Sequence, residues 1–444
     1  MKDIIIKNGT IINEGHRIEG DLRISKGRIA KIGGIIDQPG CMEIDATDLW
    51  VIPGIIDDQV HFREPGPTHK ATIYTESRAA IAGGVTSFME MPNTRPAALT
   101  QELLQDKYDI AQQSSLANYS FYMGVSNDNA EEVLQTDPAT VCGIKIFMGS
   151  STGNMLVDDE KTLQRLFSTS DILIATHCED ESTIRNNLKF YFNQYGDNIP
   201  FEYHPVIRNE KACYLSSSFA ASLAKKHDTR LHILHISTAE ELDLFDASIP
   251  LAQKRITSEV CVHHLHFDQG DYAALGALIK CNPAIKESRH KKALFKALLE
   301  DKLDVIATDH APHTSAEKSN PYTSAPAGLP LVQHALMIML DFYHHGRISA
   351  ERMVEKMCHA PAICFGIRDR GFVREGYMAD LAIVDPNASQ TISKDNILYK
   401  CGWSPLEGQT MKGRVQSTIV NGYLVYNNGK FNESVKGQRL LFNR

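Results

Sequence analysis

Short apolar segments alternate with amphipathic helical segments through the middle of the chain, and this alternation is the strongest constraint on its fold. Roughly eight such strand–helix units predict an α/β protein with a TIM-type (β/α)8 barrel. A doubly wound sheet is the alternative. Polar residues end nearly every predicted strand, which favours the barrel because barrel strands all open at one mouth. The predicted strands are Ile55–Val60, Thr86–Met91, Tyr119–Val125, Gly143–Phe147, Ile172–His177, Arg230–His235, Ile256–Cys261 and Asp304–Asp309.

Helical periodicity fills the intervals between these strands. The predicted helices include Ile73–Ala82, Thr100–Gln113, Glu160–Phe167, Ala212–Lys226 and His290–Glu300.

Both ends of the chain instead show the short alternating patterns and turn residues of antiparallel strands. Near the N-terminus we predict strands at Ile4–Lys7, Thr10–Asn13, Gly20–Ile24 and Arg28–Ile32, joined at Asn8-Gly9 and Lys26-Gly27. Near the C-terminus we predict strands at Asp380–Val384, Val415–Val420 and Tyr423–Tyr426, with turns at Asn421-Gly422 and Asn428-Gly429. We therefore expect residues 1–50 and 370–444 to form one small β-sandwich, and residues 51–369 to form the barrel.

Composition narrows the class of protein. The 444 residues are 43% hydrophobic and 23% charged, as in ordinary globular proteins. A net charge of −8 argues against nucleic acid as a partner. No apolar run is long enough to span a membrane, and the N-terminus lacks the pattern of a signal peptide. The nine cysteines form no Cys-x-x-Cys pair, so we expect reduced thiols and a cytoplasmic location.

The segment Asp57-Asp58-Gln59-Val60-His61-Phe62-Arg63-Glu64-Pro65-Gly66 follows a predicted buried strand and ends in a turn. Strand alternation places Asp57, Gln59, His61 and Arg63 on one face. The common form of this pattern has histidine at both the Gln59 and the His61 positions, which gives two imidazoles to one metal ion. Glutamine at position 59 is therefore a departure that a functional interpretation has to explain.

Further metal-ligand types stand at the ends of other predicted strands. Besides His61 these are Lys145, His177, His235 and Asp309, which a barrel would bring into one ring. A single histidine at a strand end is usually structural, and His263-His264-His266 fits a chance grouping. Because several separate strands all end in a metal-ligand type of residue, a metal site is favoured. Lys145 lies between isoleucines, so its amine either faces an acidic partner or reacts with carbon dioxide to form a carbamate that bridges two metals.

Together these motifs resemble the dihydroorotases, in the cyclic-amidohydrolase branch of the amidohydrolase superfamily. The resemblance covers nearly the whole chain. Its motifs are Asp57 to Gly66, Met91 to Pro96, the surroundings of Lys145, Thr176 to Asp180, Leu234 to Thr238, and Thr308 to His313.

The resemblance implies a zinc-dependent enzyme that reversibly cyclises N-carbamoyl-L-aspartate to (S)-dihydroorotate in de novo pyrimidine (UMP) biosynthesis, using a metal-activated hydroxide. His61 would bind the first metal, carbamylated Lys145 would bridge two metals, and His177 and His235 would hold the second. Asp309 would bind the first metal and shuttle protons. The implied substrate-binding residues are Arg63, Asn93 and His313 for the carboxylate, Asn282 for the ring, and Gly328 in a loop that closes on the substrate.

Glutamine 59 leads to a specific expectation about the metals. An amide oxygen is a poorer zinc ligand than imidazole, so one Zn2+ would be tightly bound and the second weak or absent. Gln59 would then hydrogen-bond a water or Asp309. The competing interpretation is that its amide oxygen does bind and that two metals are always present.

Other interpretations remain open on the sequence. A hydantoinase or allantoinase is the nearest, although those relatives generally lack the arginine that Arg63 provides. A non-catalytic scaffold for a partner such as aspartate transcarbamoylase would usually have lost several of the ligands kept here. The sequence leaves the oligomeric state open, homo-oligomers included. The segment from His313 to Pro330 is rich in Ser, Thr, Pro and Gly, and we expect it to be a lid.

Overall fold

Parallel strands in the middle of the chain close into a barrel. The computed structural model describes residues 2–149, 155–157 and 159–444. Its parallel pairs run in two series, β6-β7-β8 and β9 through β14, and only Tyr122 separates β8 from β9. The His61 N–H donates to the His310 carbonyl (2.7 Å) and so joins the first strand to the last. The predicted (β/α)8 barrel is confirmed. Its strands are β6 Ile55–Val60, β7 Val85–Glu90, β8 Asn118–Phe121, β9 Met123–Gly124, β10 Ile144–Phe147, β11 Ile174–His177, β12 Leu231–Ile233, β13 Ile256–Cys261 and β14 Val305–Ala307.

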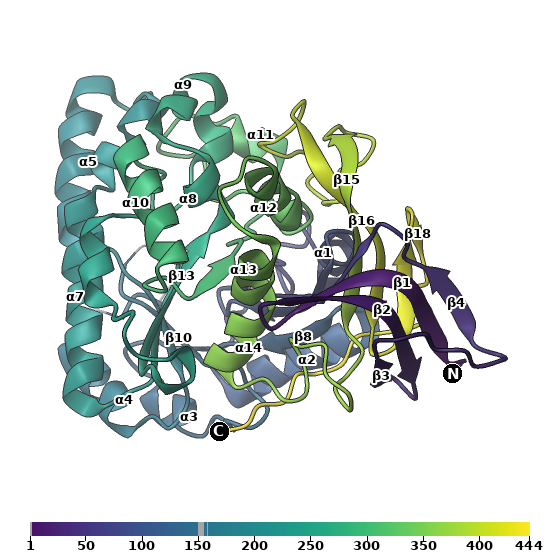
Figure 1. The fold of residues 1–444 in the computed structure, drawn as a ribbon. Coiled ribbons are helices and arrows are strands. Elements are labelled where there is room, and N and C mark those ends of the chain that lie inside the picture. Colours follow the sequence, from purple (N-terminus) through teal and green to yellow (C-terminus); the bar gives the residue numbers. More distant parts are fainter. Residues whose placement is uncertain (1, 150–154, 158) are drawn as a thin grey trace.

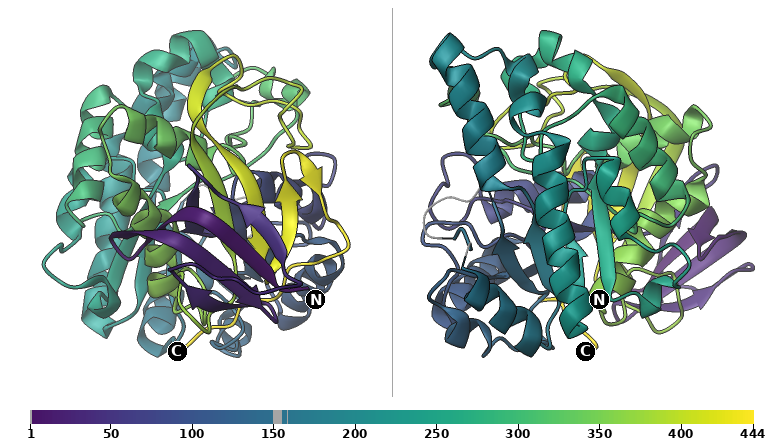
Figure 2. Two further views of the ribbon diagram at one scale, coloured as in Figure 1. Left: turned by 45° about the vertical axis from the view of Figure 1, so that its right-hand side comes forward. Right: turned by 90° about the vertical axis from the view of Figure 1, so that its left-hand side faces the viewer.

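Helices surround these strands (Figures 1 and 2). Several of the longer ones begin at a polar side chain that accepts a hydrogen bond from the third residue of the helix, as Thr72, Asp180 and Asn209 do. The α-helices are α1 Ile73–Ala82, α2 Gln101–Ser114, α3 Ala130–Val133, α4 Glu160–Thr169, α5 Glu181–Tyr195, α6 His204–Ile207, α7 Glu210–His227, α8 Val262–His266, α9 Tyr272–Leu275, α10 Ser288–Leu299, α11 Ser315–Lys318, α12 Ala335–His344, α13 Ala350–Val354 and α14 Ala360–Phe365.

Strands from both ends of the chain form the second structural unit, beside the barrel in Figure 1. Strand β5 pairs with β1 in parallel and with β15 antiparallel, which ties the two ends together. Aliphatic side chains from both ends, such as Ile4, Leu22, Leu381 and Ile419, share one core. The predicted β-sandwich is confirmed. Its strands are β1 Ile4–Asn13, β2 His16–Ser25, β3 Arg28–Ile32, β4 Met42–Asp45, β5 Trp50–Pro53, β15 Leu381–Thr391, β16 Thr410–Val420, β17 Tyr423–Asn427 and β18 Lys430–Phe431.

One predicted turn is wrong. Asn8-Gly9 is a bulge within the continuous strand β1, and the chain reverses at Glu14-Gly15 instead. Asn8 has φ 58°, so the pair has the backbone of a turn while the ladder to β2 resumes at Gly9. A Cβ on Gly9 would lie 2.8 Å from Val51, which is why glycine is needed there. The other three predicted turns, at Lys26-Gly27, Asn421-Gly422 and Asn428-Gly429, are confirmed.

The chain leaves the sheet after β18 and returns to the barrel. Tyr119 donates its N–H to Gln438 (3.0 Å) and accepts from Leu440 (2.9 Å). Among the described residues, no helix is long and apolar enough to cross a membrane. Domain boundaries at residues 50 and 370 stay a prediction.

Candidate active site

One cavity of about 280 Å³ is lined by all of the residues that the sequence singled out as ligands or substrate contacts. They reach it from the C-terminal ends of different barrel strands and from the following loops, as barrel active sites do. The lining residues are His61, Arg63, Asn93, Lys145, His177, His235, Asn282, Asp309, His313 and Gly328, together with Gln59, Phe147, Ala311, Pro326 and Ala327.

Three of these residues have a left-handed backbone. Arg63, His235 and Asp309 have φ values of 68°, 40° and 46°, which non-glycine residues seldom adopt. Each stands where the chain turns out of a strand. Such strained positions cluster at functional sites, because the surrounding structure holds the side chain in a required orientation.

His61 and Asp309 lie next to each other in the cavity wall. His61 Nδ1 lies 2.8 Å from Asn93 Oδ1 and donates to it, so the neutral ring presents the lone pair of Nε2 to Asp309 Oδ1 at 3.1 Å. Gln59 Nε2 donates to the same Oδ1 (3.2 Å). Burial lowers the pKa of His61, which favours the neutral ring. Two electron-rich atoms at 3.1 Å fit a shared cation.

In a second pair, His177 and His235, the His177 ring is oriented by groups that the sequence did not single out. His177 Nε2 donates to Glu179 Oε2 (2.9 Å), which leaves Nδ1 facing His235 Nε2 at 3.0 Å. Arg208 grips Glu179 through two hydrogen bonds (3.0 and 2.6 Å). Burial works to raise the pKa of Glu179, but Arg208 and His177 hold it well below its usual range. A carboxylate behind a histidine is the usual outer support of a metal ligand.

Lys145 has the surroundings of a neutral amine. Its Nζ is buried without a hydrogen-bond partner, and among the described residues no carboxylate lies within 4.0 Å of it. The Phe147 ring centroid is 4.5 Å from Nζ. Burial lowers the pKa of Lys145 to about 7, although Cys178, Glu259 and Asp309 partly oppose the shift. The acidic partner that the sequence left open is therefore not seen, and the amine is available for chemistry.

Arg63 and His313 lie at the other side of the cavity, and Lys70, which contacts His313, is paired with Glu317 (2.8 Å). Arg63 donates from Nε to the Pro312 carbonyl (3.1 Å), and its Nη2 lies 3.1 Å from His313 Nε2. His313 Nε2 donates to Ala327 (3.0 Å) while Lys70 Nζ donates to His313 Nδ1 (2.9 Å), so the imidazole is neutral. Burial, with Arg63 and Lys70 nearby, holds the pKa of His313 far below its usual range. Burial also lowers the pKa of Arg63, to about 10, so the guanidinium stays charged.

Two buried lysines hold the loop that covers this side. Lys318 Nζ donates to the carbonyls of Lys280 (3.3 Å), Pro326 (3.0 Å) and Gly328 (3.0 Å). Lys280 Nζ donates to Tyr322 and Ala325 (both 2.6 Å). The Gly328 N–H donates to the Lys280 carbonyl (2.8 Å), and a Cβ on Gly328 would lie 2.4 Å from the Ala311 carbonyl. The loop is pinned in this conformation, with its Gly328 N–H already engaged.

Asn282 offers an open hydrogen-bond acceptor. Its Oδ1 is buried in the cavity wall with no partner among the described residues. A buried, unsatisfied carbonyl oxygen is costly unless a ligand supplies a donor. The geometry therefore suits an N–H group of a bound ligand.

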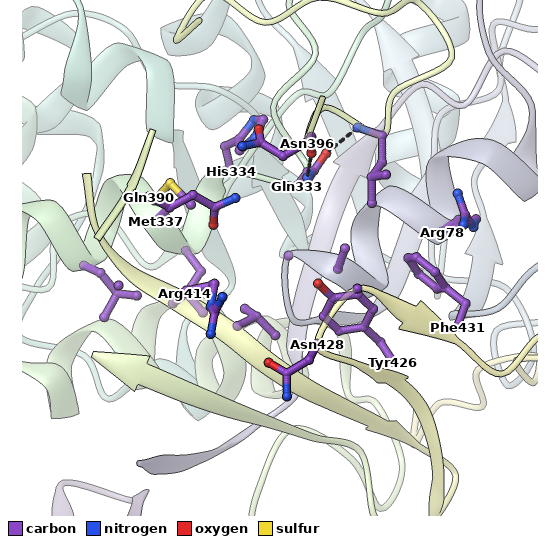
Figure 3. Close-up of a pocket in the computed structure, with 18 of the residues that line it drawn as sticks. Arg78, Gln333, His334, Met337, Gln390, Asn396, Arg414, Tyr426, Asn428 and Phe431 are labelled. Carbon is purple, nitrogen blue, oxygen red and sulfur yellow. Dashed lines mark hydrogen bonds between the residues drawn. The ribbon is translucent and has the colours of Figure 1, made fainter. Parts of the chain in front are cut away.

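A second cavity, of about 350 Å³, lies between α12 and β16 and contains none of the predicted site residues (Figure 3). Its polar lining includes Arg78, Gln333, Arg414 and Asn428, and it lacks the convergent imidazoles and carboxylate of the first cavity. The metal-type donors thus identify the barrel mouth as the candidate active site.

The family follows from comparison with known proteins. Residues 50–425 match the Amidohydrolase family, and the chain belongs to it. It is 33% identical over 412 residues to a dihydroorotase of Halobacterium salinarum, covering 92% of each chain. It is also 30% identical to an allantoinase of Deinococcus radiodurans over 454 residues, covering 99% of this chain and 98% of the other.

A solved structure shares the architecture. The L-hydantoinase (dihydropyrimidinase) of Arthrobacter aurescens superposes with a TM-score of 0.93 at 25% identity, covering 99% of this chain and 100% of the other. These relatives place the chain among cyclic amidohydrolases and support the assignment of an enzyme.

Proposed function

We propose that the protein is a dihydroorotase, which interconverts N-carbamoyl-L-aspartate and (S)-dihydroorotate in pyrimidine biosynthesis. The observation that carries this proposal is the half-buried guanidinium of Arg63 at the cavity wall. Its side-chain contacts are a carbonyl and a histidine, and no carboxylate of the described chain lies within 4.0 Å of it. A partly desolvated cation in a cavity wall favours a counter-ion, and the ring carboxylate of dihydroorotate would supply one. Hydantoin and allantoin have no such carboxylate.

The donor set fits a zinc centre. His61 and Asp309 would hold one ion, and His177 and His235 the other, with carbamylated Lys145 between them. The fit rests on the His61 Nε2 lone pair that faces Asp309 Oδ1 at 3.1 Å, on the 3.0 Å approach of His177 Nδ1 to His235 Nε2, and on the unpartnered amine of Lys145. When bound, zinc would supply an activated hydroxide at neutral pH and polarise the amide carbonyl.

The residues of the chain would perform the remaining steps. Arg63, with the cationic surroundings of His313, would fix the carboxylate, and the Asn282 Oδ1 would accept a ring N–H. Asp309 would take the proton of the attacking nucleophile on a carboxylate oxygen and return it to the departing ring nitrogen. Gln59 Nε2 and His61 Nε2 both lie at Asp309 Oδ1, so Oδ2 would be the oxygen for this transfer.

The direct test is turnover of dihydroorotate and carbamoyl aspartate by zinc-loaded protein, beside hydantoin and allantoin at the same concentrations. We expect both directions with the carboxylated substrates and little activity on the other two. Allantoin has to be included in the assay because one of the relatives is an allantoinase. Turnover of allantoin or hydantoin equal to or above that of dihydroorotate would overturn the proposal.

A further inference from the structure

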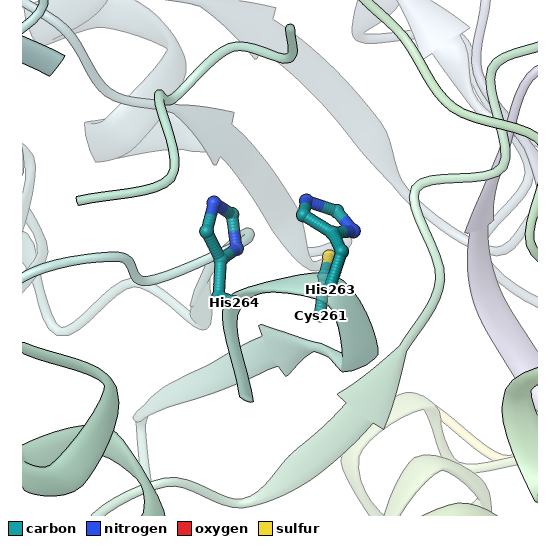
Figure 4. Close-up of side chains that lie close together, drawn as sticks. All are labelled: Cys261, His263 and His264. Atoms are coloured by element: carbon teal, nitrogen blue, oxygen red, sulfur yellow. The ribbon is translucent and has the colours of Figure 1, made fainter. Parts of the chain in front are cut away.

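A second group of metal-type donors lies beside the cavity, at the end of the seventh barrel strand. Cys261 is the last residue of β13, and His263 and His264 lie in the short helix α8 that follows. Figure 4 shows the two imidazoles side by side, with the thiol of Cys261 next to the His263 ring. One donor atom from each residue lies within 4.8 Å of the other two, and all three side chains are buried. The sequence pattern alone was consistent with a chance grouping.

The hydrogen bonds of the two histidines leave nitrogen atoms free in the interior. His264 Nε2 donates to the Pro283 carbonyl (3.1 Å), which fixes the tautomer and leaves a lone pair on Nδ1. That Nδ1 has no partner among the described residues, and neither ring nitrogen of His263 has one. The Thr308 carbonyl lies near His263 without forming a hydrogen bond of normal geometry. Buried imidazole nitrogens are normally satisfied, so these vacant positions call for a ligand.

The pattern at His264 is the one that metal-binding histidines use. A ligating imidazole typically donates its other N–H to a backbone carbonyl or carboxylate, and this orients the free nitrogen. Two oxygen atoms also face the thiol, because Cys261 Sγ donates to Gln59 Oε1 and to Glu259 Oε1, each at 3.9 Å. In a tetrahedral zinc site a sulfur and an oxygen ligand are roughly 3.5 Å apart. Gln59 Oε1 can therefore serve as a fourth donor once the thiol has lost its proton.

We propose that Cys261, His263 and His264 form a further metal site, for Zn2+ or a similar thiolate-binding divalent cation, separate from the ions at the cavity. Binding forms the metal–sulfur bond and releases the thiol proton to solvent, with no change of oxidation state. The site places a cation beside Gln59, on the side of the amide opposite to Asp309.

Cobalt provides a selective probe. None of the residues that line the cavity is a cysteine, so a thiolate-to-cobalt charge-transfer band in the near ultraviolet reports this site alone. The full-length protein is produced in cobalt-supplemented, zinc-depleted medium, so that the metal is present while the chain folds. We expect the band in the natural protein and in Lys145→Ala, which removes the bridge at the cavity. We expect its loss in Cys261→Ser.

Cys178→Ser is the matched control, because Cys178 is also a buried thiol, beside His177, and donates to Thr176 Oγ1. This variant should keep the band. His264→Gln retains a donor for the Pro283 carbonyl but removes the free nitrogen, so it should weaken or shift the band. Metal analysis of Lys145→Ala should show roughly one equivalent retained, and none in the double variant with Cys261→Ser.

Two results would overturn the site: cobalt bound at the cavity with no thiolate band, or a band that survives Cys261→Ser. Neither result depends on catalytic activity. A protein that shows the band but does not turn over dihydroorotate would contradict the proposed function and leave this site standing.

Discussion

The Gln59 side chain donates to Asp309, with Nε2 3.2 Å from Oδ1, and so acts on the carboxylate instead of replacing the imidazole that the common motif has there. Its amide oxygen points the other way, toward Cys261 Sγ at 3.9 Å. Position 59 thus orients Asp309, the proposed proton shuttle, and would leave His61 and Asp309 to hold the first metal.

This contact predicts unequal affinities for the two metals at the cavity. After mild chelation we expect about one zinc to survive at the His177–His235 side of the natural protein, and closer to two in Gln59→His. The missing imidazole bond weakens the first metal site, and each ~1.4 kcal/mol of binding free energy lost corresponds to a tenfold weaker affinity for zinc. The measurement is the number of zinc ions per chain in two proteins that retain Lys145, with Gln59 or with His at position 59. Both also carry Cys261→Ser, so that zinc at the proposed thiol site is not counted. Two tightly held cavity metals with Gln59 in place would contradict the prediction.

Lys145→Ala should lose cavity metal and activity together, because the proposed bridge is absent. A short carboxylic acid with added zinc should partly restore both. Asp309→Asn is the comparison: it should keep metal at His177 and His235 but lose turnover by ~10²-fold or more. If high-resolution density showed a plain amine beside a full metal pair, the bridge would be wrong.

The pKa of about 7 for Lys145 predicts how reconstitution depends on pH. Because the folded-state pKa lies below the usual lysine value, the amine is neutral above pH 7 and protonated below it. Only the neutral amine reacts with carbon dioxide. At fixed dissolved carbon dioxide, metal-free protein should therefore regain activity roughly tenfold more slowly at about pH 6 than at about pH 8. A reconstitution rate that is flat across this range would refute the shift.

Arg63→Lys should lower kcat/KM for dihydroorotate, since lysine keeps the charge but cannot present a planar fork to the carboxylate. We expect a loss of ~10²-fold, expressed mainly in KM, with metal content unchanged. Arg185→Lys is the control, because Arg185 is exposed and pairs with Glu181 on the outer helix α5. An unchanged KM would remove the argument for a substrate carboxylate at Arg63.

Glu179→Gln should weaken zinc at the His177–His235 side by ~10–100-fold and destabilise the fold. Arg208 would be left as a buried cation without its partner, at a cost of about 3–5 kcal/mol in the free energy of unfolding. Glu181→Gln, which removes a surface pair, should cost about 0.5 kcal/mol or less. Urea unfolding of the metal-free proteins separates this effect from metal loss, and equal stability of the two variants would contradict the expectation.

Local signals predicted much of this architecture. The strands Ile55–Val60 and Ile256–Cys261 and the helix Ile73–Ala82 have the expected bounds, because strong apolar patterns meet clear stop signals there. Strands β12 and β14 end two residues before the predicted His235 and Asp309, because the chain there turns into loop residues that are buried around the cavity, whereas β11 begins two residues later than predicted. His235 and Asp309, for example, follow their strands in a left-handed conformation that cannot be predicted from the residue type.

The supporting groups of the site were harder to predict. Glu179 stood inside a recognised motif, two residues after His177, but its partner Arg208 comes from a different segment. Lys318 and Lys280 look like surface lysines in sequence, yet each is buried beneath the loop and bonded to its carbonyls. Such roles depend on tertiary contacts between distant segments, which a single sequence does not encode in any local pattern.

The pairing of β5 with β15 also determines when, during synthesis, the sheet of the second structural unit can fold. Ile52 lies opposite Ala382, so the edge of β5 has no partner until the ribosome has made nearly the whole barrel. An open apolar strand edge is a template for pairing between chains. The nascent protein therefore exposes an unpaired, aggregation-prone strand edge in its N-terminal segment for most of its synthesis. Slow translation, or truncation before β15, should favour aggregation over folding.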